Sequence, residues 1–247
     1  MTPLILALVG LPIGLVLDAL IVRLAVMPDD DEDGESELPE ESASEPNAWS
    51  APALGAETGT LVLAAEHPGV SWSRRLIVVA ATAGLFAIAG ARFDGAHQLA
   101  VVTAYIAVLL ICAGTDALVY RVPNVVTYPA ILGATVVGAL MPGAAFYEVL
   151  AGGALAGGLL LLPSILTGGL GMGMGDVKLA AFVGLALGFT KVVPALIFMA
   201  LGGGLVAVLL LLLRFRKRGE PIPYAPFISI GAIVTLLWFG AAFETLS

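Results

Sequence analysis

Two aspartates, Asp116 and Asp176, each lie beside a long apolar stretch of this chain. An ionisable side chain next to a membrane span is costly and indicates a function. Two carboxylates that share one proton can hydrolyse a peptide bond: one deprotonates a water, and the other polarises the carbonyl or protonates the leaving amine. The pair therefore predicts aspartic protease chemistry, provided that the fold brings the two residues together.

The residues before and after Asp176 favour a helix start. The apolar stretch that begins at Val177 predicts a helix, and Asp176 is expected to cap it. Gly173 and Gly175 belong to a glycine run that is expected to shape the turn before this helix and to leave room for a substrate backbone. Lys178 follows two residues after Asp176. It either favours the ionised aspartate or anchors the helix at the membrane surface.

The segment after Asp116 contains Arg121, Pro123 and Asn124. The alternative to a catalytic role is that Asp116 forms an ion pair with Arg121 at the membrane interface. Pro123 and Asn124 are typical of a turn followed by the start of a helix. All three are therefore expected to shape the site.

The composition predicts the elements that must position these residues. Apolar residues make up 59% of the 247 residues and charged residues only 12%, which indicates an all-α, polytopic membrane helical bundle. Apolar runs of about 20 residues suit a core ~30 Å thick, and about eight transmembrane helices are expected. They are placed near 3–26, 76–91, 99–114, 125–141, 149–167, 177–189, 192–213 and 226–243. Lys191 and Pro194 are expected to separate the sixth from the seventh, as a tight hairpin; one long tilted helix is the alternative.

The net charge of −8 belongs to one segment. Residues 28–73 hold 12 acidic residues and no lysine or arginine, while the rest of the chain holds seven acidic and 11 basic residues. Acidic runs with proline and serine are typical of disordered linkers. The expected organisation is a first transmembrane helix (1–27), an acidic disordered cytoplasmic loop (28–73) and a membrane core with seven transmembrane helices (74–247).

The basic residues predict the orientation, because cytoplasmic loops are enriched in lysine and arginine. With eight spans, nine basic residues fall on the side of the acidic loop and two on the other side. The nine are Arg23, Arg74, Arg75, Arg121, Lys178, Arg214, Arg216, Lys217 and Arg218, and the two are Arg92 and Lys191. Both aspartates are then expected at the cytoplasmic surface. Merging spans six and seven would move the 214–218 cluster outside, which the rule opposes.

Other chemistries find little support in the sequence. Cys112 is the only cysteine, so an intrachain disulfide is excluded, and its apolar surroundings indicate a buried core residue. His67 and His97 lie apart from any ligand cluster, and no metal site is expected. We expect a lipid bilayer as surroundings and no nucleic acid as a partner.

Taken together, these motifs resemble the type IV prepilin leader peptidases, membrane aspartic peptidases of the Gly-x-Gly-Asp class. Residues 172–181, Met-Gly-Met-Gly-Asp-Val-Lys-Leu-Ala-Ala, are similar to the motif of that family's second aspartate. Asp116 followed by Pro123 and Asn124 is similar to the first. Residues 222–227 resemble the segment entering the last span, and residues 10–23 resemble the first span more loosely.

The resemblance implies a reaction, a place and partners. Such enzymes cut the leader peptide from type IV prepilins and type II secretion pseudopilins. The cut lies at the cytoplasmic face of the bacterial inner membrane, just before the hydrophobic helix of the pilin. Asp116 and Asp176 would be the catalytic pair, with no cofactor for proteolysis. Many members also methylate the new N-terminus with S-adenosylmethionine. The pilus or secretion assembly machinery is a further partner that the resemblance implies.

The chain departs from the family pattern at two places. The loop after the first span lacks the paired cysteines of classical members, so no zinc is expected and methyltransferase activity is left open. Asp18 stands in the first span where an asparagine is usual. It either pairs with a nearby basic group or makes a polar contact with the substrate or the methyl donor.

Three other classes compete with a peptidase of this kind. A catalytically silent assembly factor of a pilus or type II secretion system would keep the motifs for packing only. A small-solute transporter would place its aspartates near the middle of the bilayer, whereas Asp116 and Asp176 are expected at the ends of spans. A presenilin-like peptidase shares Gly-x-Gly-Asp, but its other aspartate follows a tyrosine, unlike Thr115-Asp116.

Overall fold

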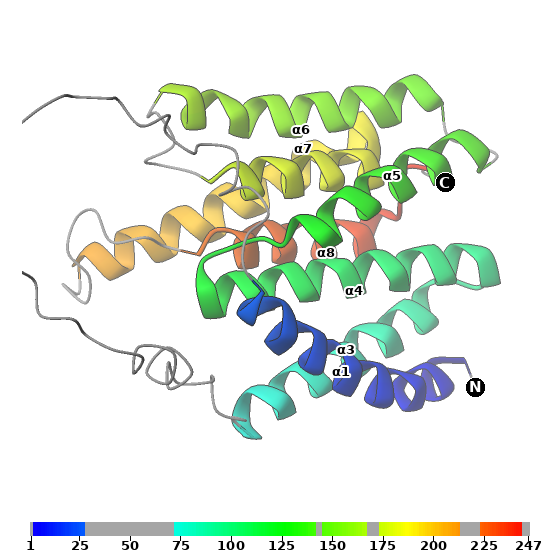
Figure 1. The fold of residues 1–247 in the computed structure, drawn as a ribbon. Helices are drawn as coiled ribbons and strands as arrows, with labels where there is room; N and C mark the ends of the chain where they lie inside the picture. Colours follow the sequence, from blue (N-terminus) through cyan, green and yellow to red (C-terminus); the bar gives the residue numbers. More distant parts are fainter. Residues whose placement is uncertain (1, 28–71, 142–144, 167–172, 213–222, 244–247) are drawn as a thin grey trace, which may run out of the picture.

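The part of the chain that the structure describes is helical throughout. This computed structural model describes residues 2–27, 72–141, 145–166, 173–212 and 223–243. They form α1 (Thr2–Val26), α3 (Trp72–Arg92), α4 (Ala96–Val119), α5 (Asn124–Leu140), α6 (Phe146–Leu166), α7 (Met174–Leu212) and α8 (Ala225–Phe239). These helices pack side by side in one bundle, and α1 and α3 are tilted across each other (Figure 1). The all-α prediction is confirmed. The predicted acidic loop lies outside the described residues, except that its last two residues already belong to α3.

Helix length and composition identify a multi-pass membrane protein. Five helices are long and apolar enough to cross a membrane: α1, α3, α4, α6 and α7, of which α7 reaches this length over two segments. The apolar helices α5 and α8 are shorter, with 17 and 15 residues. Since a perpendicular crossing takes about 20 residues, the predicted count of about eight spans stays a prediction. Large apolar side chains such as Leu8, Leu132 and Ile197 remain exposed, as lipid contact requires.

Helix α7 is two helical segments that meet at Gly188. This glycine has φ 74° and ψ 168°, outside the helical region. The chain turns back there, where the colour changes from yellow to orange (Figure 1). The predicted hairpin is therefore found, but its expected separators, Lys191 and Pro194, both lie within the helix. Glycine reaches positive φ without a steric cost, whereas proline keeps the φ of a helix.

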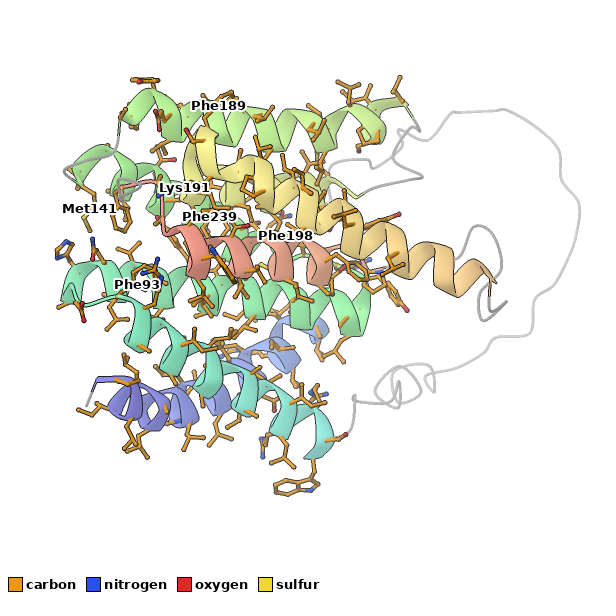
Figure 2. All side chains as sticks on the ribbon, turned by 180° about the vertical axis from the view of Figure 1, so that it is seen from behind. Phe93, Met141, Phe189, Lys191, Phe198 and Phe239 are labelled. Atoms are coloured by element: carbon orange, nitrogen blue, oxygen red, sulfur yellow. The ribbon has the colours of Figure 1, made fainter. Side chains whose placement is uncertain are left out.

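The turn of α7 is tied to the segment that follows α8. The Ala242 N–H donates to the carbonyl of Ala186 at 2.9 Å. The Lys191 ammonium is buried and donates to the carbonyl of Ala241 at 2.7 Å. Lys191 and Phe189 lie at the end of the bundle opposite the start of α3 (Figure 2). These bonds hold the second half of α7 in place beside α8.

Glycines allow α6 and α7 to pack backbone against backbone. A Cβ atom built on Gly184 would lie 2.1 Å from the carbonyl oxygen of Gly152, and one on Gly152 would lie 2.4 Å from that of Gly184. Any side chain at either position would force the helices apart. Close packing through small residues, which is common between membrane helices, accounts for these glycines.

A stripe of residues four apart joins α1 to α3. Gly10 and Gly14 lie so close to α3 that a Cβ atom on either would be 2.7 Å from a backbone atom of that helix. One turn further, buried Asp18 forms ion pairs with Arg74 (3.0 Å) and Arg75 (3.3 Å). Residues i and i+4 lie on one helix face, so these three contacts form one continuous seam.

Candidate active site

Asp116 lies in the last turn of α4 and is buried, with 4% of its surface exposed. Its Oδ2 accepts a hydrogen bond of 2.9 Å from the backbone N–H of Ala225, the first residue of α8. The first N–H groups of a helix lack partners within the helix, and they carry the positive end of its dipole. The start of α8 therefore fixes this carboxylate and provides a favourable electrostatic contact for it.

Asp176 lies in the first turn of α7, which begins at Met174. The expectation that Asp176 caps the helix is wrong, because the helix starts two residues before it. The Asp176 carboxylate accepts a hydrogen bond from the backbone N–H of Gly173, in the manner of a capping box. Its Oδ1 is buried and has no partner among the described residues. This oxygen is available to a substrate or a water.

One pocket of about 170 Å³ contains both aspartates. The two carboxylates are close enough to interact electrostatically. The pocket lies at the end of the bundle where α4 ends and where α5, α7 and α8 begin (Figure 1). Its lining includes the predicted site residues Asp116, Arg121, Asn124, Gly173, Gly175, Asp176 and Lys178, together with Tyr120, Val122 and Met174. The fold thus brings together residues that are 60 positions apart in the chain.

Lys178 joins α7 to the start of α5 beside this pocket. Its ammonium donates to Oδ1 of Asn124 at 2.8 Å and lies 4.7 Å from the centre of the Tyr128 ring. Both contacts stabilise the Lys178 cation. Lys178 and Asn124 therefore hold two walls of the pocket together as well as lining it.

The remaining predicted residues set the backbone around the pocket. Pro123 is the N-cap of α5, and its carbonyl accepts hydrogen bonds from the N–H groups of Val126 and Thr127, which confirms the predicted helix start. A Cβ atom on Gly175 would lie 3.0 Å from Cβ of Val122. Glycine at position 175 therefore lets α7 approach the 120–123 turn closely. Gly173 lies just before the helix, where its N–H reaches Asp176.

Sequence reasoning missed two contributors to the pocket. Tyr120 ends α4 in the left-handed conformation (φ 56°, ψ 35°), and its N–H bonds the carbonyl of Asp116. A tyrosine in this conformation is uncommon, and such strained residues cluster at functional sites. The Ala225 N–H is a backbone donor without a side-chain signature. Pro226, which is typical of a first helical turn, was the available signal for a helix end there.

Asp18 lies outside the pocket. Both of its carboxylate oxygens are engaged by the arginines at the start of α3, which is the pairing that one of the two sequence interpretations expected. A contact of Asp18 with a substrate or a methyl donor stays a prediction. Within the described ranges there is no group of three or more histidine, cysteine or acidic side chains that could hold a metal ion.

The fold and the pocket define a multi-pass helical membrane protein that holds two buried aspartates at one end of its bundle. Residues 103–212, which include both aspartates, match the type IV leader peptidase family. This match confirms the resemblance to that family which the sequence motifs predicted. No solved structure matches the chain significantly.

Several curated relatives are each named prepilin leader peptidase/N-methyltransferase. One from Bacillus subtilis is 32% identical over 160 residues, covering 64% of this chain and 63% of the relative. One from Aeromonas hydrophila is 38% identical over 91 residues, covering 35% and 31%. One from Pseudomonas aeruginosa is 40% identical over 75 residues, covering 30% and 26%. The chain thus spans less than two thirds of the length of these relatives.

Proposed function

We propose that this protein is a membrane aspartic endopeptidase that removes the leader peptide from type IV prepilin-like or pseudopilin precursors. The observation that carries the proposal is the shared pocket of Asp116 and Asp176, in which Oδ1 of Asp176 is buried without a partner among the described residues. The names of the relatives supply the substrate class.

The chemistry follows from the paired carboxylates. One ionised carboxylate takes a proton from a water, which attacks the carbonyl carbon of the scissile peptide bond. The other, protonated, carboxyl group hydrogen-bonds the carbonyl oxygen and then supplies a proton to the leaving amine. Because the two groups titrate as a unit, acid and base are not assigned to individual residues. The Ala225 N–H and the Gly173 N–H each hold one of the carboxyl groups in position.

We further propose that the pocket faces the cytoplasm of a bacterial cell, at its inner membrane. Arg23, Arg74, Arg75, Arg121 and Lys178 belong to the helix ends and the turn on the side of the pocket, and positive residues favour the cytoplasmic side. Precursor leaders would then reach the aspartates before translocation. Cysteine labelling at Arg121→Cys in a Cys112→Ala background tests this orientation in intact cells, because an impermeant reagent should not reach position 121.

N-methylation by S-adenosylmethionine is a separate proposal, supported by the second half of the relatives' names. It is tested by the mass of the new N-terminus, which differs by one methyl group. The pilus or secretion assembly machinery is proposed as the partner that receives the product.

The decisive experiment is mass spectrometry of a prepilin co-expressed with the protein. The wild type should release the leader, while Asp116→Asn and Asp176→Asn should leave the precursor intact although both variants remain folded. Asparagine keeps the shape of the side chain, so thermal unfolding in detergent serves as the folding control. Full cleavage by Asp176→Asn would refute the mechanism. No cleavage by the folded wild type across several precursors would favour the silent assembly factor.

A further inference from the structure

A second cavity, of about 330 Å³, lies between α4 and α5 on the membrane-spanning part of the bundle. The two helices meet near the pocket and diverge away from it (Figure 1). This cavity is lined mostly by small or β-branched residues of α4 and α5, and Phe182 of α7 also lines it. We call it the α4–α5 groove; its lining is Ala100, Val101, Ala104, Tyr105, Val108, Ala130, Gly133, Ala134, Val137 and Phe182.

Two observations indicate that the groove has room for an occupant. A Cβ atom added to Gly133 would meet no atom within 4 Å, so this wall faces open space. The Tyr105 side chain is only 6% exposed and its ring packs edge-on against Phe182, with the ring centres 5.5 Å apart. Its hydroxyl has no hydrogen-bond partner among the described residues. A phenol that is nearly buried in an apolar groove gains free energy when an occupant supplies a partner.

The groove and the aspartate pocket lie one after the other along the same helices. Helices α4, α5 and α7 line both cavities. Ala104 lies 12 residues before Asp116 on α4, and Gly133 lies nine residues beyond Asn124 on α5. At ~1.5 Å per residue these positions are about 18 Å and about 14 Å deeper than the pocket. A chain held at the aspartates and continuing into the membrane as a helix would pass this groove.

We propose that the α4–α5 groove binds the apolar helix that follows the scissile bond of the precursor, an inference that rests on the proposed function. Helices associate in a membrane where small residues let their backbones approach closely, and Ala104 and Gly133 provide such walls on both sides. The Tyr105 hydroxyl can donate to a backbone carbonyl or a hydroxyl of that helix. A lipid chain offers it no acceptor below the headgroup, so the precursor helix is the better occupant.

Filling the groove tests the proposal. Gly133→Leu and Ala104→Leu place bulky side chains in the groove. The matched controls are Gly158→Leu and Ala154→Leu, at exposed positions of α6. A Cβ atom added to Gly158, as to Gly133, would meet no atom within 4 Å. Each variant is assayed on a full precursor and on a peptide that ends shortly after the scissile bond. The groove variants should raise KM for the full precursor by about tenfold, which corresponds to ~1.4 kcal/mol, and leave the peptide unaffected.

The outcomes separate this inference from the proposed function. If the folded wild type cleaves neither substrate, the proposed function fails. If the groove variants cleave both substrates like the wild type, or lose both equally, the inference is wrong and a lipid chain or nothing occupies the groove. If the wild type cleaves only the full precursor, the apolar helix of the precursor is needed for recognition. Crosslinking from position 133 then decides whether that helix lies in the groove.

The register is measured by photo-crosslinking. A benzophenone amino acid at position 133 should attach to precursor residues roughly 9–12 positions after the scissile bond, because the groove lies about 14–18 Å deeper than the pocket. The same group at position 158 on α6 is the control and should give no link. Links from position 133 to lipid alone, or to the precursor without a preferred position, would overturn the proposal.

Discussion

Replacing Gly184 by alanine should separate α6 from α7 and thereby displace Asp176. The added Cβ would lie 2.1 Å from the Gly152 carbonyl oxygen, and ordinary contact begins at 3.4 Å, so the backbones must separate there by about 1.3 Å. Overpacking of this kind costs about 1–3 kcal/mol. Asp176 lies eight residues closer to the start of α7, ~12 Å along the helix. A displacement of ~1 Å at a reacting group can lower the rate by about 100-fold.

The measurement combines thermal unfolding in detergent with the rate of precursor cleavage. Gly184→Ala should lower the midpoint of unfolding and reduce kcat/KM far more than the fraction of unfolded protein explains. Gly158→Ala is the matched control, because the same methyl group enters open space on α6. Wild-type stability and activity of Gly184→Ala would refute the idea that close contact between α6 and α7 holds the aspartate in place.

Three further predictions test other contacts. A double-mutant cycle with Lys178→Met and Asn124→Ala should give a coupling free energy of about 1–2 kcal/mol in unfolding, because a charged donor contributes more than a neutral one; additive effects would argue against the bond. Asp18→Asn should destabilise the protein by about 1–3 kcal/mol. This is less than the ~3–5 kcal/mol of a fully buried ion pair, because the two arginines are partly exposed. A loss of methylation at unchanged stability would instead favour a contact of Asp18 with the substrate or the methyl donor. Gly188→Ala should cost at least about 1–2 kcal/mol in urea unfolding, because a side chain is strained at φ 74°; a neutral effect would mean that the turn can relax.

The aspartate pair and the helices that carry it could be predicted because both depend on local sequence. Apolar length marks the spans, and a carboxylate at the end of a span is conspicuous among apolar residues. The position of Asp176 in its helix could not be predicted in this way. The glycines before it favour a turn, but the helix starts at Met174, and Gly175 packs against Val122, a contact between segments distant in sequence.

The position of the α7 turn and the contact to Asp116 depend on tertiary structure. Pro194 is a stronger local helix breaker than the single Gly188, and the charge of Lys191 interrupts the apolar run. Lys191 is nevertheless buried within the helix, with its ammonium on the Ala241 carbonyl. The donor to Asp116 is a backbone N–H that any residue at position 225 except proline could supply. A backbone group carries no side-chain signal, so only the fold reveals it.

The seam between α1 and α3 gives the protein a place where its chain can be divided. Gly10, Gly14 and Asp18 hold α1 to α3 by contacts that involve no residue of 28–71. The covalent link contributes mainly effective concentration, since closing a long loop adds little free energy for each further residue. Residues 1–27 and 72–247 produced as two polypeptides in one membrane should therefore reassemble, so that 28–71 can be shortened, exchanged or replaced by a reporter domain.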